Sequence, residues 1–209
     1  MSTPTRTRAS RKSPAERSAE IADAARHVAL EHGLAAVTLR SIAARVGVAP
    51  ALVAHYQPNM DVLVGTTFGT IVATELAEVR ELVAALPSPR ERLAHLLETL
   101  LDGTRDDVTV VWVEAWALGR RNEPLAEAVR TEMDDWRRFV QGIIESGVAA
   151  GDFEADDAAS VAWQLLGMID GLNAQALVLW GEANERGSLI SHAVEGMLGL
   201  RRGALAASS

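Results

Sequence analysis

The sequence GLAAVTLRSIAARVGVAPALVAHYQPNMDVLV, residues 33–64, decides the fold. Its apolar residues recur at intervals of three and four, which predicts two short helices, at 39–46 and from 50 to about 58. Gly47 permits a left-handed turn between them, and Pro50 suits a first helical turn because its missing N–H would be unpaired there. Where two short helices cross steeply they need small and apolar residues, here Ile42, Ala43, Val46, Val48 and Val53. The stretch therefore predicts a helix-turn-helix, although two ordinary core helices would share part of the pattern.

Helical periodicity continues on both sides of this stretch, and no segment alternates as a strand would. A helix is expected at 14–32, ending at Gly33, and a long one at 61–86, before the Pro-Ser-Pro break. Further helices are expected at 90–102, 109–121, 123–150, 156–180 and 188–201, with Gly187 among the turns. We predict an all-α chain with a disordered basic arm (1–13), a three-helix head (14–60), a helical body joined through the long helix (61–203) and a disordered tail (204–209).

Charge is divided unevenly along the 209 residues. Residues 1–60 carry eight Arg and Lys against four Asp and Glu, whereas the remainder carries 12 against 24, for a net charge of −8. A basic head on an acidic body favours contact with nucleic acid at the head alone. The 48% hydrophobic content is enough for a core, and the absence of cysteine excludes disulfides and thiolate metal sites.

Residues 18–64 resemble the tetracycline-repressor (TetR) family of transcriptional regulators. The matching positions are Gly33, Thr38, Ile42, Ala43, Gly47, Val48, His55, Tyr56 and Leu63. The resemblance implies a three-helix DNA-binding domain followed by a long connecting helix. Three positions depart from the family pattern: Ala49 replaces a capping serine, Gln57 a phenylalanine and Met60 a lysine. The first departure removes an N-cap commonly worth about 1 kcal/mol.

The resemblance also implies which side chains face DNA. Thr38 and Arg40 would lie near phosphates at the start of the second helix, and His55 and Tyr56 would approach the backbone from the third. Tyr56 could equally be a core aromatic whose hydroxyl only reaches the surface. We expect base preference to come from thymine methyl contacts, from His55 and from arginines of the arm in a minor groove. The expected DNA-binding residues are Thr38, Arg40, Arg45, Pro50, Ala51, Leu52, Ala54, His55 and Tyr56.

A head this small needs a second copy to read a two-fold operator. In the TetR family two C-terminal helices of each subunit form a four-helix bundle, and the helices expected at 156–180 and 188–201 match that placement. Gly167 and Gly171 lie one turn apart and would allow close helix approach, either in the dimer or within the chain. We predict a homodimer whose interface includes Gly167, Gly171, Leu189, Ala193 and Met197.

Five tryptophans accompany one tyrosine and three phenylalanines. Core packing is their default explanation, but four of them lie on helices that surround an effector pocket in the TetR family. The candidate pocket residues are Trp112, Trp116, Trp136, Trp163, Asp170 and Asn173. Aromatic walls with a carboxylate suit an apolar or cationic small molecule, including a quaternary amine held by cation–π contacts. The C-terminal half is also faintly similar to the choline-responsive, betaine-pathway branch of the family.

These features predict a DNA-binding transcriptional regulator: a repressor that binds a palindromic operator as a dimer and is relieved by a ligand. An activator and a helical adaptor without DNA binding are the alternatives. No catalytic residue, cofactor or metal site is expected, because nucleophile-elbow, dinucleotide, phosphate-loop and zinc-helix motifs are absent and the five histidines are scattered. The first residues lack the apolar core of a signal peptide, and polar residues interrupt the apolar stretch at 158–181. We therefore expect a cytoplasmic protein with no membrane partner.

Overall fold

The computed structural model describes residues 12–205, apart from the side chains of Ala183 and Asn184, and this range contains helices and no strand. The expected all-α fold is thereby confirmed. The arginines expected in the arm, Arg6, Arg8 and Arg11, lie outside the described residues. The elements are α1 (Pro14–His32), η1 (Leu34–Ala36, a 3-10 turn), α2 (Leu39–Val46), α3 (Pro50–Tyr56), α4 (Met60–Ala84), α5 (Pro89–Leu101), α6 (Asp106–Gly119), α7 (Glu123–Ala150), α8 (Ala158–Ala176) and α9 (Ala183–Met197).

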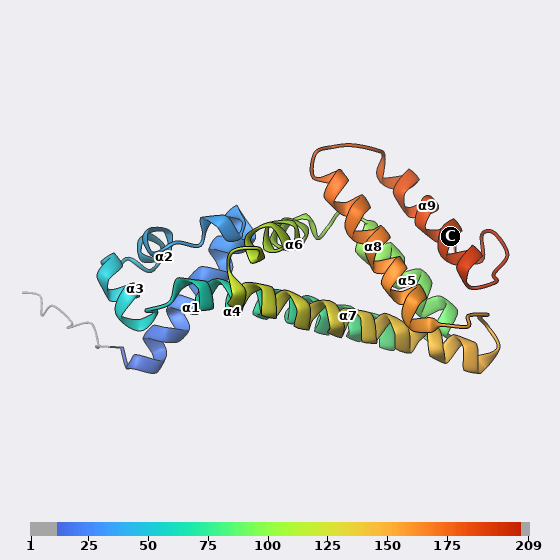
Figure 1. Ribbon diagram of the computed structural model, residues 1–209, viewed down its shortest axis with the longest axis horizontal. Helices are drawn as coiled ribbons and strands as arrows, with labels where there is room; N and C mark the ends of the chain where they lie inside the picture. Colours follow the sequence, from blue (N-terminus) through green and yellow to red (C-terminus); the bar gives the residue numbers. More distant parts are fainter. Residues whose placement is uncertain (1–11, 206–209) are drawn as a thin grey trace, which may run out of the picture.

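A small head and a larger body share the long helix α4 (Figure 1). The head consists of α1, α2 and α3 with the start of α4, while α5, α8 and α9 gather at the other end of the molecule. Helix α4 packs most extensively on α7 and also contacts α1, α5 and α6. Gly65 allows the closest approach, because a Cβ at this position would lie 2.8 Å from the Pro124 carbonyl oxygen.

Side-chain caps set most of the helix starts. Ser13, Thr38 and Ser88 accept hydrogen bonds from backbone N–H groups at the starts of α1, α2 and α5, each within a capping box. Asn59, Asn122 and Asp157 perform the same task for α4, α7 and α8. Ala49 gives α3 no such bond, as expected of alanine. The third helix therefore relies on Pro50 and on packing for its start.

The C-terminal elements differ from their predicted bounds. Helix α8 ends at Ala176 rather than at 180, and α9 begins at Ala183 and runs through Gly187, where the sequence predicted a turn. Glycine lowers helix stability without stopping a helix that packs on its neighbours, as α9 does on α5 and α8. The frayed tail was expected from 204, yet Leu205 is buried and its N–H donates to Glu195 Oε1 at 2.9 Å.

The core is one continuous cluster of buried apolar side chains that runs from the head into the body. Ile21, Ile42 and Phe68 belong to it near the head, and Ile144 and Leu165 belong to it in the body. Among the described helices, α4 alone is long and apolar enough to cross a membrane. More than half of its most apolar window is buried within the fold, as in the core helix of a globular protein.

Candidate DNA-binding head and ligand cavity

The helix-turn-helix has the geometry that its sequence predicts. Gly47 ends α2 in the left-handed region at φ 73°, and Ile42, Ala43 and Val53 are fully or almost fully buried where α2 and α3 pack on α1. Thr38 caps α2, its Oγ1 accepting from the Ser41 N–H at 3.2 Å. The first N–H groups of α2 are thus held at the surface of the head, near Thr38 and the exposed Arg40.

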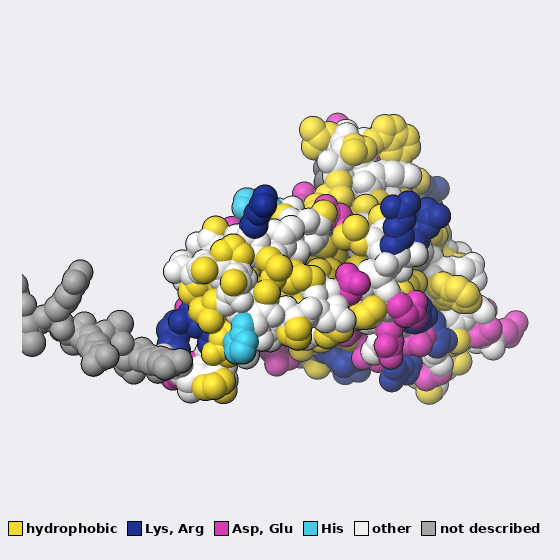
Figure 2. All heavy atoms as spheres, turned by 60° about the vertical axis from the view of Figure 1, so that its left-hand side comes forward, with side chains coloured by type: hydrophobic (Ala, Val, Ile, Leu, Met, Phe, Trp, Pro, Cys, Tyr) yellow, Lys and Arg dark blue, Asp and Glu magenta, His cyan; other side chains and the backbone are white. Residues whose placement is uncertain are grey.

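The third helix offers DNA a mainly apolar face. Pro50, Ala51 and His55 are exposed, and Leu52, Ala54 and Tyr56 are half-buried. The Tyr56 ring packs against the core and meets the His55 ring edge-on, with centroids 5.1 Å apart. Tyr56 is therefore both a packing residue and a partly exposed one. Figure 2, which brings the head forward, shows hydrophobic and uncharged surface there with few carboxylates, whereas Asp and Glu gather over the body.

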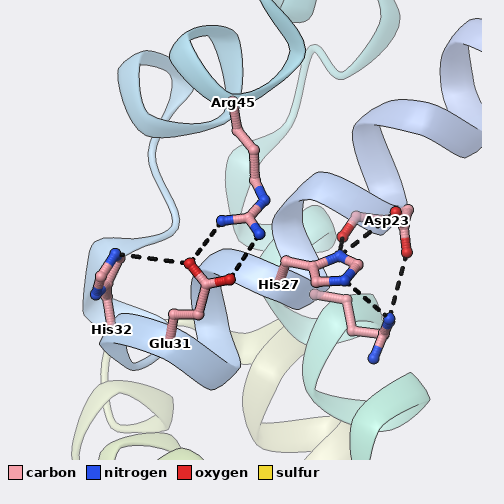
Figure 3. Close-up of polar contacts among 6 residues, drawn as sticks. Asp23, His27, Glu31, His32 and Arg45 are labelled. Carbon is pink, nitrogen blue, oxygen red and sulfur yellow. Dashed lines mark hydrogen bonds and ion pairs between the residues drawn. The ribbon is translucent and has the colours of Figure 1, made fainter.

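Arg45, expected at the DNA interface, has a partner inside the head (Figure 3). Its guanidinium donates to both carboxylate oxygens of Glu31, each at 2.6 Å, and so joins α2 to α1. The Arg45 hydrogen bond holds the pKa of Glu31 below its usual range, and the same contact raises the pKa of Arg45. The pair links the first two helices, and the partner of Arg45 lies 14 residues away in the sequence.

A cavity of about 570 Å³ opens in the body between α6, α7 and α8. The structure brings all six predicted pocket residues to its lining: Trp112, Trp116, Trp136, Trp163, Asp170 and Asn173. Behind this lining, the buried Phe68 of α4 packs edge-on against Trp112 with ring centroids 4.9 Å apart. The α6 part of this aromatic lining was predictable, because Trp112 and Trp116 lie one helical turn apart and both line the cavity.

The cavity also contains charged residues that the sequence analysis did not single out. Glu75 on α4 and Arg105 at the start of α6 line it, as do Arg130, Asp134 and Arg137 on α7. Burial raises the pKa of Glu75 to about 7, although the Arg105 charge and the Trp112 indole act in the opposite direction. Burial alone raises the pKa of Asp170 to about 6. The signal for Glu75 was present in the sequence: it lies on the same face of α4 as the buried Phe68, Val72 and Val79.

Asn173 joins the cavity wall to the end of α5. Its Nδ2 donates to the Leu100 carbonyl at 2.8 Å, so this amide is partly committed to holding α8 in place. Asp170, one turn earlier on α8, has no ion pair or hydrogen bond within the part of the chain that is described, residues 12–205. Of the two polar residues predicted on α8, Asp170 is thus the one that remains available to a ligand.

Helix α6 connects the cavity to the head. Trp112 and Trp116 line the cavity, whereas Glu114, between them in sequence, accepts a hydrogen bond from the Ala35 N–H in η1 at 2.9 Å. Gly33 makes the contact possible, because it has φ 83° and a Cβ there would lie 2.6 Å from Glu114 Oε2. Helix α6 thus contacts both the cavity and the turn between α1 and α2.

The outer surfaces of α8 and α9 are apolar and open. The most exposed large hydrophobic side chains of the described chain include Leu189, the connection Val178–Trp180 and Trp163, which also lines the cavity; Leu179 is 92% exposed. A Cβ on Gly167 or Gly171 would meet nothing within 4 Å, which excludes packing within the chain as the reason for these glycines. Ala193 is exposed as well, and Met197 is half-buried. All five residues predicted at a dimer interface thus lie on these two helices, and four are open to solvent.

Two family descriptions match this chain. Residues 21–66 match the bacterial regulatory proteins of the tetR family, and residues 89–199 match the C-terminal part of BetI-type transcriptional repressors. The HTH-type transcriptional regulator BetI of Rhizobium meliloti (strain 1021) is 30% identical over 152 residues, which cover 73% of each chain.

Solved structures with the same fold include a regulator from Saccharomonospora viridis in complex with choline, with a TM-score of 0.77 and 22% identity over 88% of this chain and 98% of that one. A TetR transcription regulator from Haloarcula marismortui has a TM-score of 0.75 and 26% identity over 88% and 99% of the two chains. These likenesses agree with the arrangement of head, long helix and body described above.

Proposed function

Because the chain belongs to the TetR family of DNA-binding transcriptional regulators, we propose that it is a homodimeric repressor that releases a two-fold operator when a cationic small molecule fills the cavity. The observation that carries this proposal is the lining of that cavity, in which four indoles occur together with Glu75 and Asp170, two carboxyl groups that burial makes costly to ionise. An indole face attracts a cation, and a buried carboxylate gains most from one.

A quaternary ammonium group fits this lining better than a purely apolar ligand does. An apolar molecule would leave Asp170 desolvated without a partner and Glu75 with only its long contact to Arg105, which costs free energy. The choline complex of the Saccharomonospora viridis protein and the similarity to BetI support the same ligand class.

The surface of α8 and α9 supports the dimer. Contiguous exposed apolar side chains of this size are unusual on a monomer and mark an interaction site. Open glycines on α8 would let a second copy approach closely. In such a dimer the two heads face one operator together, with Thr38, Arg40 and Tyr56 toward phosphates and Ala51, Leu52, Ala54 and His55 toward base edges.

Relief of repression follows from the position of α6. A ligand held by Trp112 and Trp116 favours one position of α6, and Glu114 passes that position to the head through Ala35. A ligand that binds better when the heads are wrongly spaced for the groove releases DNA by population shift.

Calorimetry with choline and with 3,3-dimethylbutan-1-ol tests the ligand class, because the two molecules have nearly the same shape and differ in charge. We expect choline to bind at least about tenfold more tightly, and Asp170→Asn to remove much of this preference. Glu145→Gln, an exposed change on α7 outside the cavity, serves as the control. Equal affinity for the two molecules would contradict a cationic ligand and favour an apolar one.

A further inference from the structure

The cavity already contains a cation of its own beside its most deeply buried carboxylate. Arg105 extends from the start of α6 toward α4, where its Nη1 lies 3.8 Å from Glu75 Oε1 and 3.5 Å from Glu78 Oε2. The Glu75 side chain is only 8% exposed, whereas that of Glu78 is 59% exposed. The guanidinium thus stands between a buried acid that lines the cavity and an acid in solvent.

The contacts of Arg105 with Glu75 and Glu78 leave the guanidinium short of hydrogen bonds. Neither contact is short enough for a hydrogen bond, and the Arg105 Nε is buried with no hydrogen-bond partner among the described residues. A buried charge without hydrogen bonds recovers little of its desolvation cost. Burial accordingly raises the pKa of Glu75 despite the positive charge beside it.

The other arginines of the cavity are held differently. Arg130 donates to Glu123 at 2.7 Å and Arg137 donates to Asp134 at 3.2 Å, and each of these carboxylates is more than half exposed. Neither of these two arginines is paired with a buried acid. Among the cavity arginines, Arg105 is the one that faces a buried carboxylate through long contacts.

We propose that Arg105 occupies the cation site at Glu75 in the ligand-free protein, and that a cationic ligand must displace it to bind. This inference rests on the cationic ligand class proposed above. A ligand cation against Glu75 takes the place of the guanidinium, which turns outward to Glu78 and solvent. Because Arg105 is the residue before α6, its release also loosens the tie between α4 and the helix that contacts the head. Arg105 therefore sets both the affinity for the ligand and the resting position of α6.

The test compares Arg105→Gln with Arg105→Lys by calorimetry, again with choline and 3,3-dimethylbutan-1-ol. At pH 9, well above the pKa of Glu75, removing the competing charge should tighten choline binding about tenfold or more, since charges a few ångströms apart interact strongly away from bulk water. Arg105→Lys keeps the charge and should stay within about threefold of the unmodified protein. Affinity for the neutral alcohol should change less than about twofold in both variants.

Arg138→Gln is the matched control, because it removes the same charge from an exposed pair with Asp135 outside the cavity. It should leave choline affinity within about twofold. Thermal unfolding checks that each variant is folded. If Arg105→Gln is not, Arg105→Met takes its place, because methionine keeps an unbranched stem like that of arginine and removes the charge.

The outcomes separate the two proposals. Choline binding that is unchanged or weaker in Arg105→Gln, or an equal gain for choline and the alcohol, overturns the displacement of Arg105 and leaves the cationic ligand class standing. If Arg105→Gln binds choline and the unmodified protein does not, the displacement of Arg105 is strongly supported. If neither the unmodified protein nor any variant binds choline, the ligand class itself is wrong and the role of Arg105 falls with it.

Discussion

Glu75 and Asp170 are two carboxyl groups whose ionisation is expected to control ligand affinity. Burial raises their pKa values to about 7 and about 6, so that acidification through this range converts both to neutral acids. A neutral acid no longer attracts a cation. Choline binding should therefore weaken as the pH falls from 8 to 5.5, by up to about tenfold per unit between pH 7 and 6 and more steeply below 6, where Asp170 is protonated as well, and it should level off above about pH 8.

Calorimetric titrations at a series of pH values check this, with the neutral alcohol as a control whose affinity should stay nearly constant. A choline Kd that does not change between pH 5.5 and 8 would contradict the role of both acids. The same raised pKa values mean that the stability linked to these groups is fullest at low pH and is lost as the pH rises through 6 and 7.

Individual residues were predictable where the sequence pattern carries local information. The tryptophans and Asp170 were found because an aromatic pair one turn apart, or an acid in an apolar helix, stands out in a single segment. Arg45 stays a predicted DNA contact, but its pairing with Glu31 was not foreseen, because that pairing depends on the angle between α1 and α2. Arg105 was not singled out, because its distance from Glu75 is set by the packing of α6 on α4. Contacts between segments that are distant in the sequence cannot be predicted from one sequence alone, because they depend on how the helices pack.

Helix α3 lacks a side-chain N-cap, and a single substitution could supply one. Ala49 has an extended backbone, with φ −71° and ψ 141°, and supplies no side-chain cap. A serine hydroxyl could accept from the first N–H groups of α3 without any backbone change. We expect Ala49→Ser to raise the free energy of unfolding by roughly 1 kcal/mol.

Chemical denaturation followed by circular dichroism measures this gain. Thr38→Ala, which removes the cap of α2, is the companion variant and should lose a similar amount. A destabilised Ala49→Ser protein would show that α3 starts in another geometry than the one described.

Helix α6 is the element expected to couple cavity and head. Glu114→Gln keeps the size of the side chain but weakens its contact with the Ala35 N–H, because the acceptor loses its charge. We expect the variant to bind choline normally while the ligand's effect on operator affinity falls several-fold. The measured quantity is the ratio of operator Kd with and without choline. An unchanged ratio would show that the signal reaches the head by another route, such as α4.

The sequence predicted the starts of helices well wherever a capping residue or a proline begins the helix. The bounds of α1 and α2 agree with the structure, because Ser13, Thr38, Gly33 and Gly47 mark their ends. The bounds of α9 do not agree, because Gly187 was taken as a turn although the helix continues through it. Glycine ends a helix only where the backbone turns left-handed, as at Gly47, and a single sequence does not show which glycines do so.

For the whole molecule, the α8–α9 surface is expected to hold two copies together. Leu189 is 60% exposed on α9, so Leu189→Glu should leave the fold of the single chain intact while placing a charge in the interface. We expect sedimentation to show a monomer, with operator affinity reduced about 100-fold or more because the second head is lost. Leu82→Glu, an exposed apolar residue of α4, is the control and should remain dimeric. A dimeric Leu189→Glu protein would place the interface elsewhere.

The central claim is that the head binds a specific operator and that filling the cavity releases it. Fluorescence anisotropy of the full-length protein on DNA from upstream of its own gene, against scrambled DNA, tests this across a salt series with and without choline. We expect tight binding to the upstream DNA alone, with an affinity that falls steeply as salt rises. Choline should abolish this binding, and 3,3-dimethylbutan-1-ol should not. Equal, weak binding to both DNAs at low salt would contradict the operator, and specific binding that choline leaves unchanged would contradict the release.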